Sequence, residues 1–246
     1  MNKRDYLPLG IVKWMVLMLV STSVWAADNQ LTSQEKADGW LLLFNGKDYT
    51  GWKNNNDRPI LSQVEEGSIQ TNKCGGYILT YDKEFGNFIL KCDIKMSDPC
   101  NSGIFLRMED LADPVSTGFE IQVATAGPDE KPTIHSVGAL YDVKAPSKIA
   151  TNGPGKWDHY EVTFAGDQLT VVLNGTEVIN ANLQDYKEPG KREVDGNHKF
   201  VKDGKPRALT DFAKKGYIGF QDHDHKVWIK NVKLLELDQN GNPLKK

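Results

Sequence analysis

The sequence predicts an all-β protein of the sandwich or barrel type, on three observations. Much of the 246-residue chain consists of short segments that alternate apolar and polar residues, which is the pattern of half-buried strands. No internal segment sustains a long 3.6-residue period, so helices should be few and short. Short turns join the strands without interposed helices, and strands connected in this way close around one core.

The clearest strand spans residues 88–96, where Phe88, Leu90, Cys92, Ile94 and Met96 share one face. Similar runs occupy residues 39–44, 77–80, 103–108, 118–124, 139–143, 157–164, 168–173, 177–181, 216–221 and 226–237. The pair Asn174-Gly175 lies between two runs and predicts a tight hairpin turn, because these residue types accept positive φ. Residues 185–211 are charged, contain glycine and proline, and lack apolar periodicity, so we expect a long loop there.

Residues 1–27 have the pattern of an export signal. A basic start precedes the apolar run Trp14 to Val24, and small residues follow it. The run is shorter than the roughly 20 residues that a membrane-spanning helix needs. We therefore expect cleavage near Ala26 or Ala27, no membrane insertion afterwards, and a single domain over residues 28–246 in the periplasm or outside the cell.

Charge and cysteine content narrow the kinds of ligand and site. The formal net charge of -3 provides no broad positive field, so we expect no nucleic-acid partner and favour a neutral or weakly polar ligand. The three cysteines, Cys74, Cys92 and Cys100, allow one disulfide and one free thiol. They form no CxxC pair and have no zinc-binding spacing with histidine. The sequence leaves the oligomeric state open.

Several ordered motifs carry a family resemblance. Residues 42–52, LLFNGKDYTGW, resemble the opening LFNGKDLxGW of the 3-keto-disaccharide hydrolase domain family of bacterial exported glycosidase-like proteins. Further matching blocks follow in the same order, namely NSGIFLR at 101–107, GFEIQV at 118–123, GALYD at 138–142, WDHY at 157–160 and GYIGFQDH at 216–223. The resemblance covers about residues 39–237. It implies a concanavalin A-like jelly-roll sandwich of two curved antiparallel sheets, with a carbohydrate substrate on the concave face.

The candidate base lies in the block GFEIQV, where period two places Glu120 and Gln122 on the same polar face. Sandwich glycosidases carry acidic residues at alternate positions of one concave strand, and here the second is an amide. Conventional glycoside hydrolysis uses two carboxyl groups. A 3-keto sugar needs only one base, because its ketone acidifies the neighbouring C2 proton, so that elimination of the glycosidic oxygen and hydration can follow.

On this reading Glu120 is the catalytic base, Arg107 stabilises the enediolate charge and Gln122 orients the sugar. His223 is the candidate general acid toward the leaving oxygen. Tyr141 offers a stacking face, and Asp142 and Asp222 are candidate sugar ligands. For each residue a structural role, such as strand end, ion pair or turn, stays open. We expect no organic cofactor and no catalytic metal, since Asp222-His223-Asp224-His225 is equally a polar turn; a calcium ion supporting a loop stays open.

Two other functions remain alternatives at this point. A non-catalytic carbohydrate-binding module would use the same polar residues without proton transfer. A conventional glycosidase on unoxidised sugar would need a second carboxylate opposite Glu120, for which Asp142 and Asp222 are the candidates.

Overall fold

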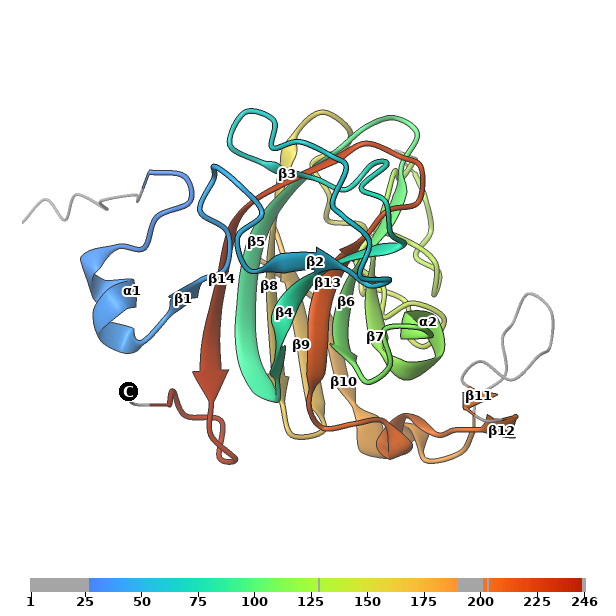
Figure 1. The fold of residues 1–246 in the computed structure, drawn as a ribbon. Helices are drawn as coiled ribbons and strands as arrows, with labels where there is room; N and C mark the ends of the chain where they lie inside the picture. Colours follow the sequence, from blue (N-terminus) through green and yellow to red (C-terminus); the bar gives the residue numbers. More distant parts are fainter. Residues whose placement is uncertain (1–26, 128, 190–200, 203, 245–246) are drawn as a thin grey trace, which may run out of the picture.

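Two antiparallel sheets face each other in the structure, a computed structural model that describes residues 27–127, 129–189, 201–202 and 204–244 (Figure 1). Sheet A contains, in spatial order, β1 (Leu41–Leu42), β14 (Val227–Leu237), β5 (Asn87–Met96), β8 (Trp157–Ala165), β9 (Gln168–Leu173) and β10 (Thr176–Asn182), and β3 (Ile69–Gln70) also pairs with β14. Sheet B contains β2 (Trp52–Asn54), β4 (Ile78–Phe85), β13 (Gly216–Gln221), β6 (Asn101–Met108) and β7 (Phe119–Ala124). The expected all-β jelly-roll sandwich is confirmed.

The helices of the described segments are short and peripheral. They are α1 (Ser33–Asp38), α2 (Pro114–Thr117) and the 3₁₀ turns η1 (Leu183–Tyr186) and η2 (Leu209–Asp211). A small hairpin of β11 (Val201–Lys202) and β12 (Lys205–Pro206) lies on the opposite side of the molecule from α1 and β1 (Figure 1). In the described residues, none of the helices has the length and apolar character needed to cross a bilayer.

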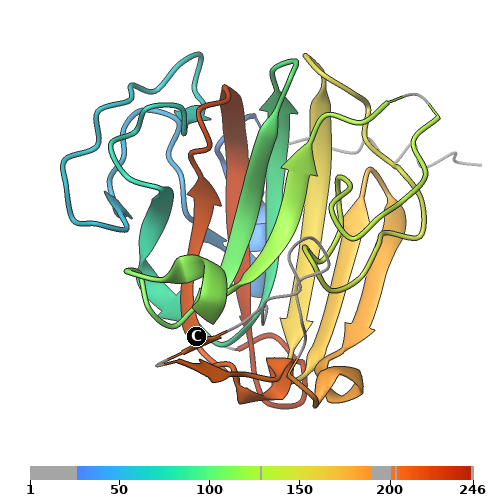
Figure 2. The same ribbon diagram turned by 90° about the vertical axis from the view of Figure 1, so that its right-hand side faces the viewer.

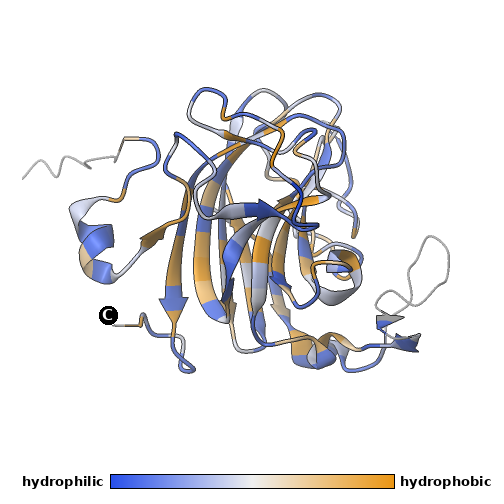
Figure 3. Ribbon diagram, viewed as in Figure 1, coloured by the Kyte–Doolittle hydropathy of each residue, from blue (hydrophilic) through white to orange (hydrophobic). Residues whose placement is uncertain are grey.

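The core lies between the sheets and follows from the period-two pattern. Along β5 the side chains alternate between buried and half-buried, as the sequence predicts. Figure 3 shows the matching bands of apolar and polar residues along the strands. The ring of Phe119 on β7 meets that of Phe164 on β8 at 5.1 Å, which joins the inner faces of the two sheets. Figure 2 shows the same strands from the side.

The predicted turn and most predicted strands are confirmed. Asn174 and Gly175 have φ of 51° and 77°, and Leu173 pairs with Thr176 across the turn. The prediction of a strand at residues 139–143 is wrong, because only Leu140 forms bridges, to Ile121 and to Lys144, before the chain turns back. Strands β2 and β3 are short and lie outside the predicted runs.

Three predictions on chain organisation have different outcomes. All three cysteines are free and buried, so the disulfide that their count allowed is absent among them. The predicted loop at residues 185–211 includes 190–200 and 203, which lie outside the described residues, and its described ends hold the η1, β11, β12 and η2 elements. The export signal at residues 1–27 also lies outside them, except for its last residue.

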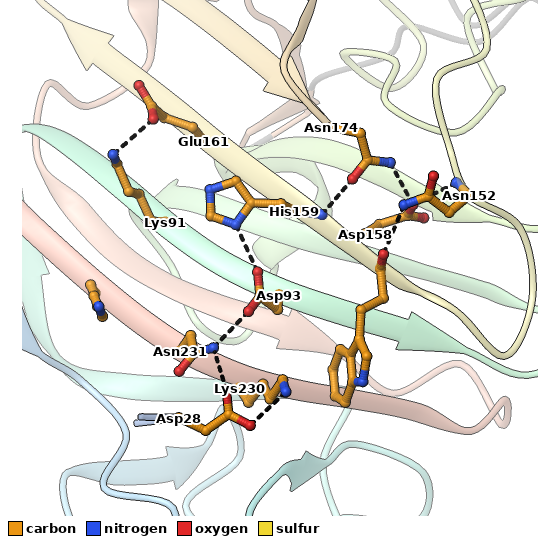
Figure 4. Close-up of polar contacts among 12 residues, drawn as sticks. Asp28, Lys91, Asp93, Asn152, Asp158, His159, Glu161, Asn174, Lys230 and Asn231 are labelled. Carbon is orange, nitrogen blue, oxygen red and sulfur yellow. Dashed lines mark hydrogen bonds and ion pairs between the residues drawn. The ribbon is translucent and has the colours of Figure 1, made fainter. Parts of the chain in front are cut away.

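A polar network crosses the outer face of sheet A, as Figure 4 shows. His159 Nδ1 lies 2.7 Å from Asp93 Oδ1, and Asn231 Nδ2 donates to Asp93 Oδ2 at 2.6 Å. Asn231 also donates to Asp28, which accepts a further hydrogen bond from Lys230 at 2.6 Å. The network therefore fixes the segment around Asp28 to strand β14.

Lysines cover the tryptophans of the same outer face. In the cross-strand row of Trp228, Lys95 and Trp157, the Lys95 ammonium lies 4.6 Å from the ring centre of Trp228 and 5.1 Å from that of Trp157. Lys226 and Lys230 approach the same two rings at 4.9 and 4.4 Å. The result is an alternating stack of ammonium groups and indole rings.

Candidate active site

The candidate base projects from the outer face of sheet B. Glu120 is half-buried on β7, opposite Phe105 of β6, and Phe105 is in turn opposite Gly219 of β13. On its other side, the N–H of Tyr141 donates to the carbonyl oxygen of Glu120 at 2.9 Å. Since Ile121 and Leu140 are bridged and both point into the core, Tyr141 shares the outer face with Glu120.

A glycine makes room for the carboxylate of Glu120. Gly103 on β6 pairs with Gln122, and a Cβ atom added to it would lie 2.8 Å from Glu120 Cγ and closer still to the carboxylate. The Glu120 side chain therefore lies across the sheet over Gly103. Gly219 is similarly crowded, since a Cβ there would lie 2.7 Å from the carbonyl oxygen of Leu79. Both positions present backbone where a larger residue would fill the space.

Two tyrosines flank this carboxylate. Tyr77, immediately before β4, accepts a hydrogen bond at its hydroxyl from Nε2 of Gln221 at 2.6 Å. Burial raises the pKa of Tyr77 above its ordinary value, and the nearby carboxylate of Glu120 and the phenol of Tyr141 raise it further, against the hydrogen bond from Gln221. Tyr77 therefore stays protonated at neutral pH and can donate from its hydroxyl.

Two buried glutamines complete the polar face. Gln122 and Gln221 are each 4% exposed. The Gln122 amide nitrogen donates to Oδ1 of Asn101 at 3.1 Å, as that of Gln221 does to Tyr77. Within the described residues, Oε1 of Gln122 and Oε1 of Gln221 have no hydrogen-bond partner. Buried acceptors without a donor are costly, so these two oxygens are an unusual feature of the polar face.

A histidine that the sequence reasoning missed lies at the rim. His135 Nε2 is 2.6 Å from Oδ1 of Asp142, and its ring centre is 5.0 Å from that of Tyr141. Asp142 adopts a positive φ of 62°, and its N–H donates to the carbonyl oxygen of Ile134, which brings it beside His135. A pairing across seven residues in a turn leaves no periodic pattern, so only the chemistry of the two side chains could have suggested it.

The prediction that Arg107 points toward Glu120 is wrong. Arg107 has a positive φ of 48° at the point where the register of β13 against β6 shifts. Its side chain turns inward and is fully buried. The guanidinium donates to the carbonyl oxygens of Gly86 and Gly166 and to Oδ1 of Asn87. It also lies 3.5 Å from the ring centre of Phe164. Arg107 is therefore a structural link between the sheets, and no enediolate can reach it.

The two predicted site residues in the turn after β13, Asp222 and His223, have different surroundings. Asp222 accepts hydrogen bonds from the N–H groups of Cys74 and Asp224, so its carboxylate holds two loops together. His223 is exposed, with its ring centre 6.3 Å from that of Tyr77. Its role as general acid stays a prediction. Across the described segments, no group of three or more His, Cys, Asp or Glu residues is arranged to hold a metal ion.

A surface cavity of about 400 Å³ lies elsewhere, at the end of β5 on sheet A. It is lined by residues 95–98, Pro154, Gly155 and Trp228. None of the predicted site residues lines it, and the ammonium of Lys95 already covers the Trp228 ring there. The clustering of a carboxylate, phenols and amides on sheet B is the stronger indication of a site.

Comparison with known proteins agrees with this geometry. The sequence model of the 3-keto-α-glucoside-1,2-lyase-like domain matches residues 39–235. The chain belongs to this family. A 3-keto-disaccharide hydrolase from Bacteroides thetaiotaomicron is 26% identical over 261 residues, covering 91% of this chain and 87% of the relative. The predicted family resemblance is thus confirmed.

Solved structures of glycosyl hydrolase-like proteins also resemble this 3-keto-α-glucoside-1,2-lyase-like domain. A proposed glycosyl hydrolase from Parabacteroides distasonis superposes with a TM-score of 0.68 at 30% identity, over 86% of this chain and all of the other. A second from the same organism gives a TM-score of 0.67 at 25% identity, over 80% of this chain and 99% of the other. Family and relatives together indicate a hydrolase that acts on glycosyl bonds.

Proposed function

We propose that the protein cleaves 3-keto-glycosides, and that Glu120 is the base that removes the C2 proton. The observation that carries this proposal is the single carboxylate held over Gly103 among phenols and buried amides on the outer face of sheet B. A second carboxylate does not stand beside it on β7, where Gln122 occupies the alternate position. A route that needs one base fits this arrangement better than paired-carboxylate hydrolysis.

The reaction divides into elimination and hydration. Glu120 takes the proton from C2, the electron pair forms the C2–C3 enediolate, and its collapse expels the glycosidic oxygen from C1, which leaves as the alcohol after taking up a proton. Water then adds at C1 of the resulting enone, and the proton returns from Glu120 to C2. The product is the free 3-keto sugar, and the base is restored. No organic cofactor is needed for these steps.

The neighbouring polar groups have matching roles in the proposal. Since Arg107 is remote, the hydroxyl of Tyr77 is the donor proposed for the developing negative charge on the oxygen at C3. Gln122 is the residue proposed to orient the sugar, and its amide is fixed by Asn101, as that of Gln221 is fixed by Tyr77. Tyr141 provides an aromatic face beside Glu120.

Glu120→Gln tests the assignment. The variant keeps the size of the side chain but cannot accept the C2 proton, so turnover of a 3-keto-disaccharide should fall by about 100-fold or more. Affinity measured by calorimetry should change little. Wild-type protein that binds this sugar without releasing product would favour a binding module, and equal activity of variant and wild type would refute Glu120 as the base.

Paired substrates separate the proposal from conventional glycosidase chemistry. The same disaccharide is supplied in its native form and oxidised at C3, and free monosaccharide is followed by chromatography. We expect release from the oxidised sugar, while release from the native sugar at a comparable rate would show that the ketone is not required. In D2O, exchange of the proton held by Glu120 before it returns would place deuterium at C2 of the product, which reports proton removal.

We also propose that the protein works in the periplasm or outside the cell, on the basis of the signal-like residues 1–27. The hydrogen bonds of Asp28 to Lys230 and Asn231 support a folded domain that starts at this point. The mature protein, purified from the exported fraction, should begin at Ala27 or Asp28 by N-terminal sequencing. Retention of Met1 in the cytoplasmic fraction would contradict the proposal.

A further inference from the structure

The loop between β7 and β8 brings the side chains of His135 and Asp142 together. Nε2 of His135 and Oδ1 of Asp142 are 2.6 Å apart, within hydrogen-bonding distance. The Asp142 side chain is 6% exposed, and that of His135 is 33% exposed. A nearly buried carboxylate thus orients a histidine whose ring can be reached from outside.

The backbone around His135 is held in place by its own loop. The N–H of His135 donates to the hydroxyl of Thr133 at 3.2 Å, and the N–H of Thr133 donates to the hydroxyl of Ser136 at 3.0 Å. Ser136 in turn donates to Glu130 at 2.6 Å. The N–H of Asp142 closes the loop on Ile134 at 2.9 Å. Such a bonded loop fixes the ring, as a group that transfers protons requires.

Tyr141 lies between the His135–Asp142 pair and Glu120 and places the pair near the candidate base. Tyr141 neighbours Glu120 on the outer face of sheet B, and the rings of His135 and Tyr141 lie 5.0 Å apart. His135 therefore belongs to the rim of the same site, on the side of the loop, whereas Tyr77 and Gln221 lie on the side of β4 and β13. A sugar held over Glu120 would present its C1 substituent to one of these two sides.

We propose that His135, oriented by Asp142, donates the proton to the departing glycosidic oxygen. The inference rests on the proposed function and adds the acid to the base. With Nε2 held by the carboxylate, Nδ1 is the nitrogen left for the substrate, and in the proposal Asp142 stabilises the imidazolium before transfer.

The proton count closes over a full cycle. During elimination Glu120 gains the C2 proton and His135 Nδ1 loses one to the leaving oxygen. During hydration Nδ1 takes a proton from the water that adds at C1, and Glu120 returns its proton to C2. Both side chains end in their starting states, so no further reactant is needed.

Leaving-group dependence distinguishes a proton donor from a residue that only supports the fold. A sugar alcohol leaves poorly without a proton, whereas a nitrophenol leaves as its anion. His135→Gln should slow cleavage of a 3-keto-disaccharide by about 100-fold or more and release of nitrophenolate from the matching aryl 3-keto-glucoside by only a few-fold. Asp142→Asn should change the same ratio in the same direction and to a smaller extent.

The chain supplies a matched control. His159 pairs with Asp93 at 2.7 Å on the outer face of the opposite sheet, so His159→Gln removes a similar pair far from the site and should leave both rates unchanged. Equal losses with both leaving groups in His135→Gln, or no loss with either, would overturn the proposal. A selective loss in His223→Gln but not in His135→Gln would also overturn it and identify His223 as the acid.

The ratio of the cleavage rates with the two leaving groups tests the proposed acid independently of the proposed base. If the wild type cleaves only unoxidised sugars, the proposed function fails, and the same comparison is made with the alkyl and aryl glycosides that it does cleave. Single-turnover rates separate elimination from hydration, and circular dichroism of each variant verifies that it is folded. The effect on the ratio then reports the acid, whatever the effect of Glu120→Gln.

Discussion

Replacing Arg107 by methionine should reduce stability and leave the chemistry of the folded protein intact. The guanidinium donates to the carbonyl oxygens of Gly86 and Gly166 and to Asn87 Oδ1, at 2.8, 3.0 and 3.0 Å. These bonds tie β6 to the β4–β5 turn and to the β8–β9 turn. Burial lowers the pKa of Arg107 to about 10, which is still far enough above neutrality that the side chain stays charged.

The magnitude follows from what methionine lacks. It fills a similar volume but donates no hydrogen bond. A hydrogen bond from a charged donor contributes about 1.5–3 kcal/mol, and because the turn carbonyls can regain water in the variant, we take about 1 kcal/mol for each. The loss of the contact with the Phe164 ring removes about 1 kcal/mol more. Relief of the desolvation cost offsets part of this, so we expect a net loss of about 3 kcal/mol.

Equilibrium unfolding in urea measures this loss. With a slope of about 3 kcal/mol per molar urea for a domain of this size, the midpoint should fall by about 1 M. The turnover number, measured without urea on the variant shown to be folded, should stay within a few-fold of the wild type. An unchanged midpoint together with a 100-fold fall in turnover would refute the reasoning and return Arg107 to the site.

Two further predictions follow from close packing. Gly103→Ala should lower turnover by at least about tenfold with little effect on the fold, because its Cβ would displace the Glu120 side chain. The control is Gly127→Ala, which should behave as the wild type because no atom lies within 4 Å of its added Cβ. Equal turnover of the two variants would contradict the role of Gly103. Burial raises the pKa of Cys74 to about 11 and of Cys100 to about 12, so these thiols stay protonated at pH 8. Both should therefore resist iodoacetamide at pH 8 until the protein is unfolded, as measured by mass spectrometry. Rapid labelling of the native protein would contradict this prediction.

The fold was accessible from the sequence because its main signal is local. Alternation along β5 and the Asn174-Gly175 turn depend on neighbouring residues alone, and both were predicted correctly. The strand periodicity could not distinguish a sandwich from a barrel, and the jelly-roll arrangement was predicted from the family resemblance of the motifs. Strand β2 was missed because its three residues are too few to establish a period.

The site was only partly accessible because side-chain direction depends on backbone detail. Period two correctly placed Glu120 and Gln122 on one face, since β7 is regular. The same rule failed for Arg107, where an irregularity in β6 turns the side chain inward. The pairing of His135 with Asp142 depends on a closed loop, and no spacing rule describes it.

The stack of lysines and tryptophans on sheet A has a practical consequence for measuring sugar binding. Trp157 and Trp228 have their rings occupied by ammonium groups, Trp40 is covered by Lys91, and Trp52 is stacked on Phe220 in the core. In the part of the chain that the structure describes, aromatic contact at the site is therefore left to tyrosines. Indole emission should respond weakly to a saccharide, and tyrosine absorbance or heat is the signal to follow in a titration.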